Sequence, residues 1–254
     1  MLFTKKQIEF YPIFTGLGSV FNSNNHFKIL LLSKFVKLML KISLLRSNKV
    51  LFQNKDNYNF FNKKISKIKN HEIILGSGVN LENFKYSRYT NQKIIFIMIA
   101  RLLKDKGVRE YIYAANIIKQ KFPKVCFKLI GSIENSFNSI SLKEINELIK
   151  NNSVEYLGEK NEVYKFLKES SVCVLPSYHE GLPRSVLEAM ATGRPIITTN
   201  APGCKETVFD GLNGFLIPIK DTHHLIKKIE YFINNPNKIS IMGDESYKIV
   251  KQKF

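Results

Sequence analysis

The chain has 254 residues, of which 44% are hydrophobic and 12% aromatic, so it can bury one large or two modest cores and is not a disordered tail. Its three cysteines form no C-x-x-C pair, which argues against a disulfide framework or a structural zinc site. The formal net charge of +18 favours nucleic acid, anionic lipid or phosphorylated substrates as partners, and because lysine is abundant throughout, charge alone does not choose among them.

The first predicted element is a helix over residues 27–45, the most hydrophobic segment of the chain. Lys34, Lys37 and Lys41 interrupt this segment, so it falls short of the uninterrupted apolar span that a bilayer crossing needs. The three lysines recur at spacings of three and four, which places them on one helical face. Two interpretations stay open: the helix lies on an anionic membrane surface, or it is partly buried with its lysines in solvent.

Three short elements follow this helix. They are strand candidates at 49–52 and 72–75 and a helix candidate at 55–62. So few elements cannot complete a doubly wound domain. The next stretch, residues 76–92, contains glycines and then polar residues, a composition that is typical of a linker.

From Lys93 onward, apolar runs alternate regularly with helical patterns. The predicted strands are 93–99, 125–130, 154–157, 172–175 and 195–199, and the predicted helices between them are 107–121, 141–150, 161–170 and 184–192. This alternation predicts a parallel sheet with right-handed crossovers, an open α/β domain. An extended piece at 214–217 and helices at about 221–234 and 237–252 follow it.

Ligands of open α/β sheets bind beyond the carboxyl ends of the strands, where this sequence gathers glycines, cations and carboxylates. Four strand ends carry them: Arg101, Lys104, Lys106 and Gly107 after the first, Gly131 and Ser132 after the second, Gly158, Glu159 and Lys160 after the third, and Ser177 to Gly181 after the fourth. Arginine suits bidentate contact with a phosphate, and lysine supplies a point charge to the same group. Each cation alone is typical of a solvated surface, but the four ends together indicate an anionic ligand.

The stretch from Ser177 to Arg194 reads SYHEGLPRSVLEAMATGR and contains the most informative pattern for a ligand site in this sequence. A strand feeds through a glycine turn into a helix that Pro183 opens, and the free N–H groups and dipole of such a helix start favour a phosphate. Glu180 and Glu188 would repel that phosphate unless they accept hydrogen bonds from hydroxyls, so the pattern suits a nucleotide sugar. The alternative is that Glu180 is an ordinary surface carboxylate near a helix start.

Six motifs occur in a fixed order along the chain. They are ARL at 100–102 with Lys106-Gly107, LIG at 129–131, VEYLG at 154–158, LPS with EGLP within 175–183, EAMA with GRP within 188–195, and GCKE with DGLNG within 203–214. Together they resemble the donor half of family-4 retaining glycosyltransferases, which have the GT-B fold of two Rossmann-like domains. The likeness covers about residues 73–235. Within it, the sequence of residues 199–218, TNAPGCKETVFDGLNGFLIP, is most similar to bacterial enzymes that add hexoses or N-acetylhexosamines to lipid-linked oligosaccharides.

The resemblance implies a role for each matching residue. Arg101 and Lys106 would grip the donor diphosphate and neutralise the departing nucleotide diphosphate. Glu180 would contact hydroxyls of the donor sugar near the reacting carbon, and these three residues form the expected catalytic set. The expected donor-binding set comprises Glu188 on the ribose hydroxyls, Gly181, Leu182 and Pro183 at the phosphate seat, Gly131 where the sheet edge approaches the nucleotide, and Gly158 near the base.

The resemblance also implies that neither a metal nor another cofactor is needed, because the family uses no divalent ion. The sequence agrees with this, since His179, His223 and His224 form no metal-ligand pattern. The pair His223-His224 is better explained as the surface start of a helix.

The resemblance assigns four segments to the chain. Residues 1–75 would be the last part of an acceptor-side Rossmann-like domain that is truncated at its N-terminus, 76–92 a linker, 93–235 the nucleotide-sugar donor-binding domain, and 236–254 a C-terminal helix. The fold class is thus α/β of the GT-B type, with one Rossmann-like parallel-sheet donor domain preceded by a partial acceptor domain.

The expected function is transfer of a hexose or N-acetylhexosamine from a nucleotide diphosphate donor, UDP-linked, with retention of configuration. The acceptor would be a lipid-linked saccharide in cell-surface polysaccharide or lipopolysaccharide synthesis, at the inner face of the cytoplasmic membrane. One alternative is a catalytically inactive fragment that only binds nucleotide sugar or membrane. A nucleic-acid binder is the other, but no nucleic acid partner is expected because the lysines are not interleaved with aromatics in a recognisable module.

Overall fold

The computed structural model describes residues 9–16, 27–90, 93–136 and 138–254, with only the backbone for 27–31. The chain divides into two compact units, Met1–Gly76 with Glu180–Leu182, and Ser77–His179 with Pro183–Phe254. Parts of the predicted first domain and linker, residues 1–8, 17–26 and 91–92, lie outside the described residues.

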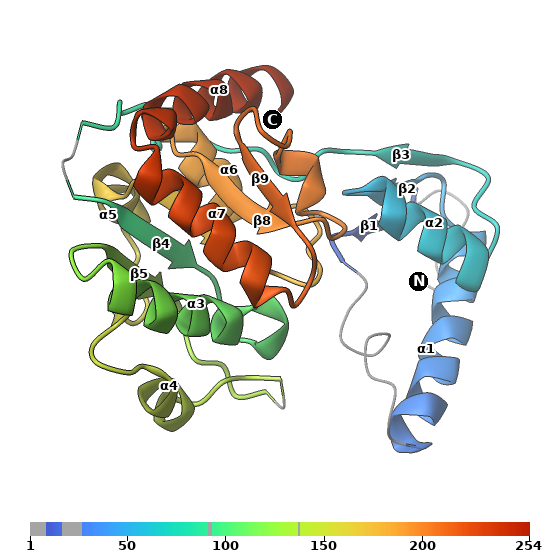
Figure 1. The fold of residues 1–254 in the computed structure, drawn as a ribbon. Coiled ribbons are helices and arrows are strands. Elements are labelled where there is room, and N and C mark those ends of the chain that lie inside the picture. The colour runs from blue at the N-terminus through green and yellow to red at the C-terminus, as the bar shows by residue number, and fades with distance from the viewer. Residues whose placement is uncertain (1–8, 17–26, 91–92, 137) are drawn as a thin grey trace. The chain divides into compact units, whose positions relative to one another are not determined.

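The second unit is built on a parallel sheet of six strands in the order β6-β5-β4-β7-β8-β9 (Figure 1). The strands are β4 (Ile95–Ile99), β5 (Cys126–Ile130), β6 (Glu155–Tyr156), β7 (Val172–Leu175), β8 (Ile196–Thr199) and β9 (Gly214–Ile217). Counted along this unit, the spatial order is 3-2-1-4-5-6, that of a doubly wound Rossmann sheet. The predicted parallel α/β domain is therefore confirmed.

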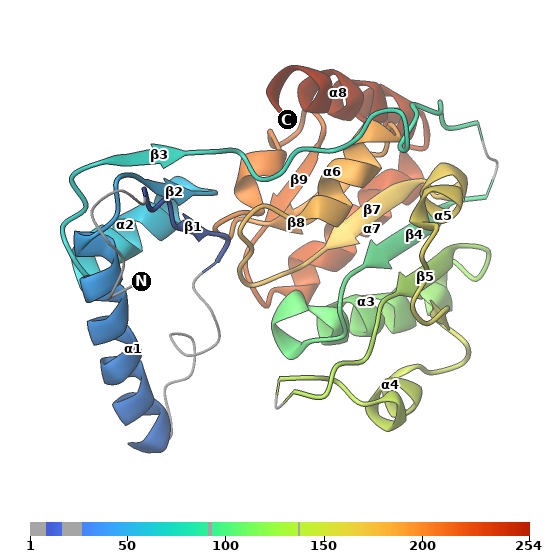
Figure 2. The same ribbon diagram turned by 180° about the vertical axis from the view of Figure 1, so that it is seen from behind.

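Helices cover both faces of this sheet, which explains why β7 and β8 are buried along their whole length. On one face, α3 (Val108–Lys121) and α7 (Thr222–Asn234) pack side by side (Figure 1). On the other, α6 (Arg184–Ala191) packs against α8 (Asn237–Lys253) (Figure 2). The unit also contains α4 (Leu142–Leu148), α5 (Val163–Glu169) and the short 3₁₀ turns η2 (Lys104–Lys106) and η3 (Lys205–Thr207).

The expected helices and strands occur, and the differences lie at their ends. The helix expected over 141–150 stops at Leu148, where the chain turns extended at Ile149. Asn151 and Asn152 then take the left-handed conformation, with φ of 50° and 51°, which asparagine tolerates better than most residues. At its other end Ser141 caps this helix, since its hydroxyl oxygen accepts from the N–H of Glu144.

A buried arginine, Arg194, joins the segment around Ser87, near the start of the second unit, to the rest of that unit. Arg194 has no exposed surface, and its guanidinium donates to the carbonyls of Ser170, at 3.0 Å, and of Ser87. Burial lowers the pKa of Arg194 to about 10. The preceding Gly193 has φ of 79°, and a Cβ there would lie 2.9 Å from the ring of Tyr86, so a side chain would clash with the anchored segment.

The first unit contains a small parallel sheet in the order β1-β2-β3, with strands Ile13–Phe14, Val50–Phe52 and His71–Ile73. Its helices are α1 (Phe27–Leu45) and α2 (Lys55–Lys64). The core is aromatic, since the rings of Phe14 and Phe61 lie 4.2 Å apart and those of Phe52 and Phe61 lie 5.5 Å apart between centroids. The strand expected at 72–75 is displaced slightly toward the N-terminus, where it pairs with β2.

Helix α1 presents apolar side chains to solvent. The exposed ones are Leu32, Phe35, Leu38, Met39 and Leu45. Lys34 and Lys41 are exposed beside them, whereas Lys37 is half-buried. Across the described part of the chain, no helix combines the length and apolarity that a membrane crossing requires.

Candidate functional site

The strand order of the second unit's sheet reverses between β4 and β7, which are paired neighbours. In open α/β sheets this reversal separates the loops that follow the two strands and leaves a crevice at their carboxyl ends, where ligands bind. Arg101 and Lys106 lie in the loop after β4, and Ser177 follows β7. The topology therefore brings both loops to the edge that the sequence predicted as a ligand site.

Lys106 ends the short turn η2, which leads into α3 through Gly107. Gly107 has φ of 75°, and a Cβ on it would lie 2.2 Å from the carbonyl oxygen of Pro176. Only glycine permits this approach of the two loops. The turn that carries Lys106 is consequently packed directly against the chain leaving β7.

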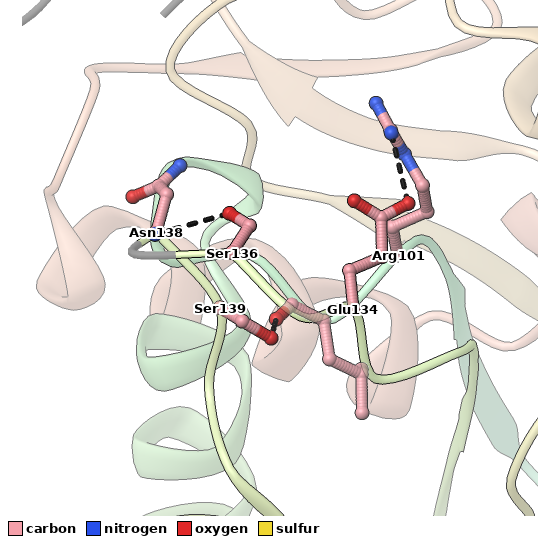
Figure 3. Close-up of polar contacts among 6 residues, drawn as sticks. Arg101, Glu134, Ser136, Asn138 and Ser139 are labelled. Carbon is pink, nitrogen blue, oxygen red and sulfur yellow. Dashed lines mark hydrogen bonds and ion pairs between the residues drawn. The ribbon is translucent and has the colours of Figure 1, made fainter.

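Arg101 forms an ion pair with Glu134, with 2.9 Å between the guanidinium nitrogen and the carboxylate oxygen (Figure 3). Glu134 lies in the loop after β5, which folds along the loop after β4 through the bonds Leu102 N–H to Ser132 O and Ile140 N–H to Leu102 O. The side chain of Arg101 is 59% exposed and that of Glu134 is partly exposed, at 35%. Solvent-accessible pairs of this kind contribute at most about 1 kcal/mol, so the bond between Arg101 and Glu134 is weak.

Gly131 and Gly158, which follow β5 and β6, are brought together. The N–H of Gly131 donates to the carbonyl of Gly158 at 3.0 Å, and the Tyr156 hydroxyl donates to the carbonyl of Gly131 at 3.0 Å. A Cβ on Gly131 would lie 1.7 Å from the carbonyl oxygen of Ala100, at the end of β4, so no side chain fits. Gly158, with φ of 72°, faces open space instead.

Helix α6 begins directly after Pro183 without a side-chain cap, so its first turn keeps N–H groups available to an anion. Glu188 lies on the second turn and is 9% exposed. Its carboxylate lies 3.2 Å from the guanidinium of Arg184, one turn earlier. Burial raises the pKa of Glu188, and the Arg184 charge partly opposes that rise.

Glu180, Gly181 and Leu182 group with the first unit. The Asn54 amide, at the cap of α2, donates to the carbonyl of Gly181 at 2.8 Å and to that of Glu180 at 3.3 Å. A Cβ on Gly181 would lie 1.8 Å from the carbonyl oxygen of Thr15. The backbone of this segment is therefore fixed by the first unit.

No group of three or more His, Cys, Asp or Glu side chains in the described residues is arranged to hold a metal ion. His224 contacts Asp221 at 2.6 Å at the start of α7, where Asp221 also caps the helix. Among the described residues, Cys126 in β5, Cys173 in β7 and Cys204 before η3 form no disulfide. Burial raises the pKa of Cys173 to about 12, so this thiol is not a nucleophile at neutral pH.

Residues 79–249, about two thirds of the chain, match the family described as Glycosyl transferases group 1. The chain belongs to this family. It is 30% identical over 238 residues to the N,N'-diacetylbacillosaminyl-diphospho-undecaprenol alpha-1,3-N-acetylgalactosaminyltransferase of Campylobacter jejuni, and the alignment covers 89% of the chain and 61% of that protein. The chain thus spans about three fifths of the length of this relative.

Two solved structures show the same fold. Sucrose-phosphate synthase of Thermosynechococcus elongatus matches with a TM-score of 0.84 over 98% of the chain and 65% of its own, at 20% identity. HepE of Anabaena, in complex with UDP-glucose, matches with a TM-score of 0.74 over 87% of the chain and 65% of its own, at 19% identity. The chain therefore has the α/β architecture of GT-B glycosyltransferases, with Rossmann-like parallel sheets.

Several residues beside the site were not foreseen from the sequence. Glu134 lies in an irregular loop, and no pattern links it to Arg101. Arg184 could have been found, because it stands four residues before Glu188 on a predicted helix. Asn54 belongs to a segment far from the motifs, so its bond to Gly181 has no local signal.

Proposed function

We propose that the chain is a retaining glycosyltransferase that transfers a hexose or N-acetylhexosamine from a UDP-linked donor to a lipid-linked saccharide. The observation that carries the proposal is the meeting of two motif-bearing loops at the point where the β4–β7 sheet order reverses. There the turn that carries Lys106 packs against the chain that leads toward Glu180 and Glu188, which are separated by seven residues and define the E-x7-E segment. In sheets of this order, that crevice holds nucleotides.

Arg101 and Lys106 bind the donor diphosphate in this proposal. When the bond from the sugar C1 to the diphosphate oxygen breaks, the electron pair stays on UDP, and the two cations stabilise the added negative charge. The diphosphate replaces Glu134 as the partner of Arg101, which is favourable because the exposed pair is weak and the incoming anion carries more charge. With two cations in place, no divalent metal is required, and transfer is expected to survive EDTA.

The two carboxylates of the E-x7-E segment serve hydroxyl groups. Glu180 contacts the donor sugar, and Glu188 accepts from the ribose hydroxyls. The buried carboxylate of Glu188 supports this role, since desolvation makes a hydrogen-bond donor valuable there. The N–H groups at the start of α6, with Gly181, Leu182 and Pro183 before them, seat a phosphate, while Gly131 and Gly158 border the nucleotide.

The acceptor and the location follow from a different observation. The Campylobacter relative is named for a diphospho-undecaprenol acceptor, which is a membrane lipid. Helix α1 exposes apolar side chains beside lysines, a combination that suits the surface of an anionic bilayer. We therefore place the protein at the inner face of the cytoplasmic membrane, in cell-surface polysaccharide or lipopolysaccharide synthesis.

One experiment separates this function from its alternative, a chain that binds nucleotide sugar or membrane but does not transfer. The full chain is incubated with UDP-hexoses and UDP-N-acetylhexosamines and an undecaprenyl-diphosphate-linked sugar in vesicles, with and without EDTA. Proton NMR of the product reports the anomeric configuration. Retained configuration supports the proposal, inversion contradicts it, and donor binding without any product supports the alternative.

A further inference from the structure

Tyr178 stands at the junction of three loops on the carboxyl edge of the second unit's sheet. Its backbone N–H donates to the carbonyl of Asp105 at 2.8 Å, and the hydroxyl of the neighbouring Ser177 donates to the same carbonyl at 3.2 Å. Asp105 is the residue directly before Lys106 in the turn η2. Two hydrogen bonds from the chain after β7 thus hold the carbonyl next to the proposed diphosphate-binding lysine.

The side chain of Tyr178 makes the second connection. Its hydroxyl donates to Glu110 Oε1 at 2.5 Å, in the first turn of α3. Glu110 stands four residues after Lys106, so Tyr178 binds the chain on both sides of this lysine. The other oxygen of the carboxylate, Oε2, is buried without a partner, which makes the tyrosine bond the more important to Glu110.

A third contact comes from the turn between β9, which ends at Ile217, and α7. The ammonium of Lys220 lies over the Tyr178 ring, 5.1 Å from its centroid. Lys220 has φ of 61°, an unusual conformation for a lysine, which shows that the surrounding structure holds this turn in place. The Lys220 contact thus adds to the bonds with Asp105 and Glu110. Burial together with the Glu110 bond raises the pKa of Tyr178, so the hydroxyl stays a donor.

We infer that Tyr178 is a positioning residue for Lys106, which it holds ready for the donor diphosphate by binding Asp105 and Glu110 on either side of it. The inference rests on the proposed function, because it assigns Lys106 to the diphosphate. It extends that function to a residue that makes no contact with the donor itself. Pre-organised cations lose less freedom on binding an anion, so the effect appears as affinity for phosphate groups.

The test is a double-mutant cycle on the full chain. Tyr178→Phe keeps the ring and the backbone bond and removes only the hydroxyl bond to Glu110. We expect it to weaken UDP and inorganic pyrophosphate binding about three- to tenfold, measured by calorimetry, and to leave uridine binding unchanged. In a Lys106→Ala background, Tyr178→Phe should have no further effect, whereas in an Arg101→Ala background its effect should persist.

A ligand-free measurement tests the ordering of the turn by Tyr178 separately from the proposed function. The N–H of Lys106 bonds to the carbonyl of Leu103 at 3.1 Å, so hydrogen exchange at this amide reports order in the turn. Tyr178→Phe should speed that exchange about tenfold, and the control Tyr113→Phe, on an exposed position of α3, should not.

Unchanged exchange, or an equal loss of affinity with and without Lys106, overturns the inference. Failure of the unaltered chain to bind UDP and pyrophosphate overturns the proposed function instead, while the exchange measurement still decides whether Tyr178 orders the turn.

Discussion

Replacing Gly131 by alanine tests the packing that builds the candidate site. The Cβ would lie 1.7 Å from the carbonyl oxygen of Ala100, and both groups belong to backbone at the ends of paired strands. A contact between carbon and oxygen needs about 3.2 Å or more, so the ends of β4 and β5 must separate by more than an ångström. Gly131 itself has no left-handed φ, and the cost is therefore one of space alone.

We expect Gly131→Ala to lower the free energy of unfolding of the second unit by at least about 3 kcal/mol, the upper range for overpacking a well-filled site. Gly211→Ala is the matched control. Gly211 has φ of 79° but nothing within 4 Å of its Cβ position. Gly211→Ala should therefore lower the free energy of unfolding only by the cost of a left-handed alanine, about 1–2 kcal/mol.

Unfolding in urea is monitored by hydrogen exchange at the buried amides of β4 and β5. These amides report the stability of the second unit separately from that of the first. A Gly131→Ala protein that is as stable as the Gly211→Ala protein would refute the reasoning, because the two loops would then have room that the structure denies them. Loss of UDP binding in Gly131→Ala is also expected, since the ends of both strands border the site.

Three further predictions concern the buried charges and helix α1. In Arg194→Lys a single ammonium replaces the two guanidinium nitrogens that bond the Ser170 and Ser87 carbonyls, which should lower the unfolding free energy in urea by about 2 kcal/mol. An unchanged value would contradict the anchor. Burial raises the pKa of Glu188, so the stability linked to its protonation is full below the unfolded pKa and is lost as pH rises through the folded pKa. The free energy of unfolding should therefore decline across that pH interval, and Glu188→Gln should flatten the decline. An identical decline in the variant would contradict the raised pKa of Glu188. Lys34→Glu with Lys41→Glu should lower the affinity for phosphatidylglycerol vesicles, measured by co-sedimentation, at least about tenfold. The control Lys143→Glu with Lys165→Glu, at exposed positions of α4 and α5, should leave that affinity unchanged.

The architecture of the second unit could be predicted because its signals are local and repeated. Strands β4, β5, β7 and β8 are short apolar runs between helical patterns, and a buried parallel strand needs little more than that. The start of α6 was equally clear, since Pro183 can open a helix but cannot continue one.

Other features depend on contacts between distant residues, which no local pattern encodes. The bond from Asn54 to Gly181 joins positions 127 residues apart, and the pair of Arg101 with Glu134 depends on how an irregular loop folds. Gly131 was expected to make room for a nucleotide. The structure shows a second reason for a glycine at this position, because any Cβ would collide with the carbonyl oxygen of Ala100. The roles of the site residues toward a donor remain predictions.

Calorimetric titration with UDP tests the central claim most directly. Three proteins are compared: the unaltered chain, Arg101→Ala and Lys121→Ala. Lys121 is the matched control, since like Arg101 it is 59% exposed and pairs with a glutamate at 2.9 Å. The account predicts saturable UDP binding that Arg101→Ala weakens about tenfold or more and Lys121→Ala leaves unchanged. No UDP binding by the folded, unaltered chain, or equal losses in the two variants, would contradict it.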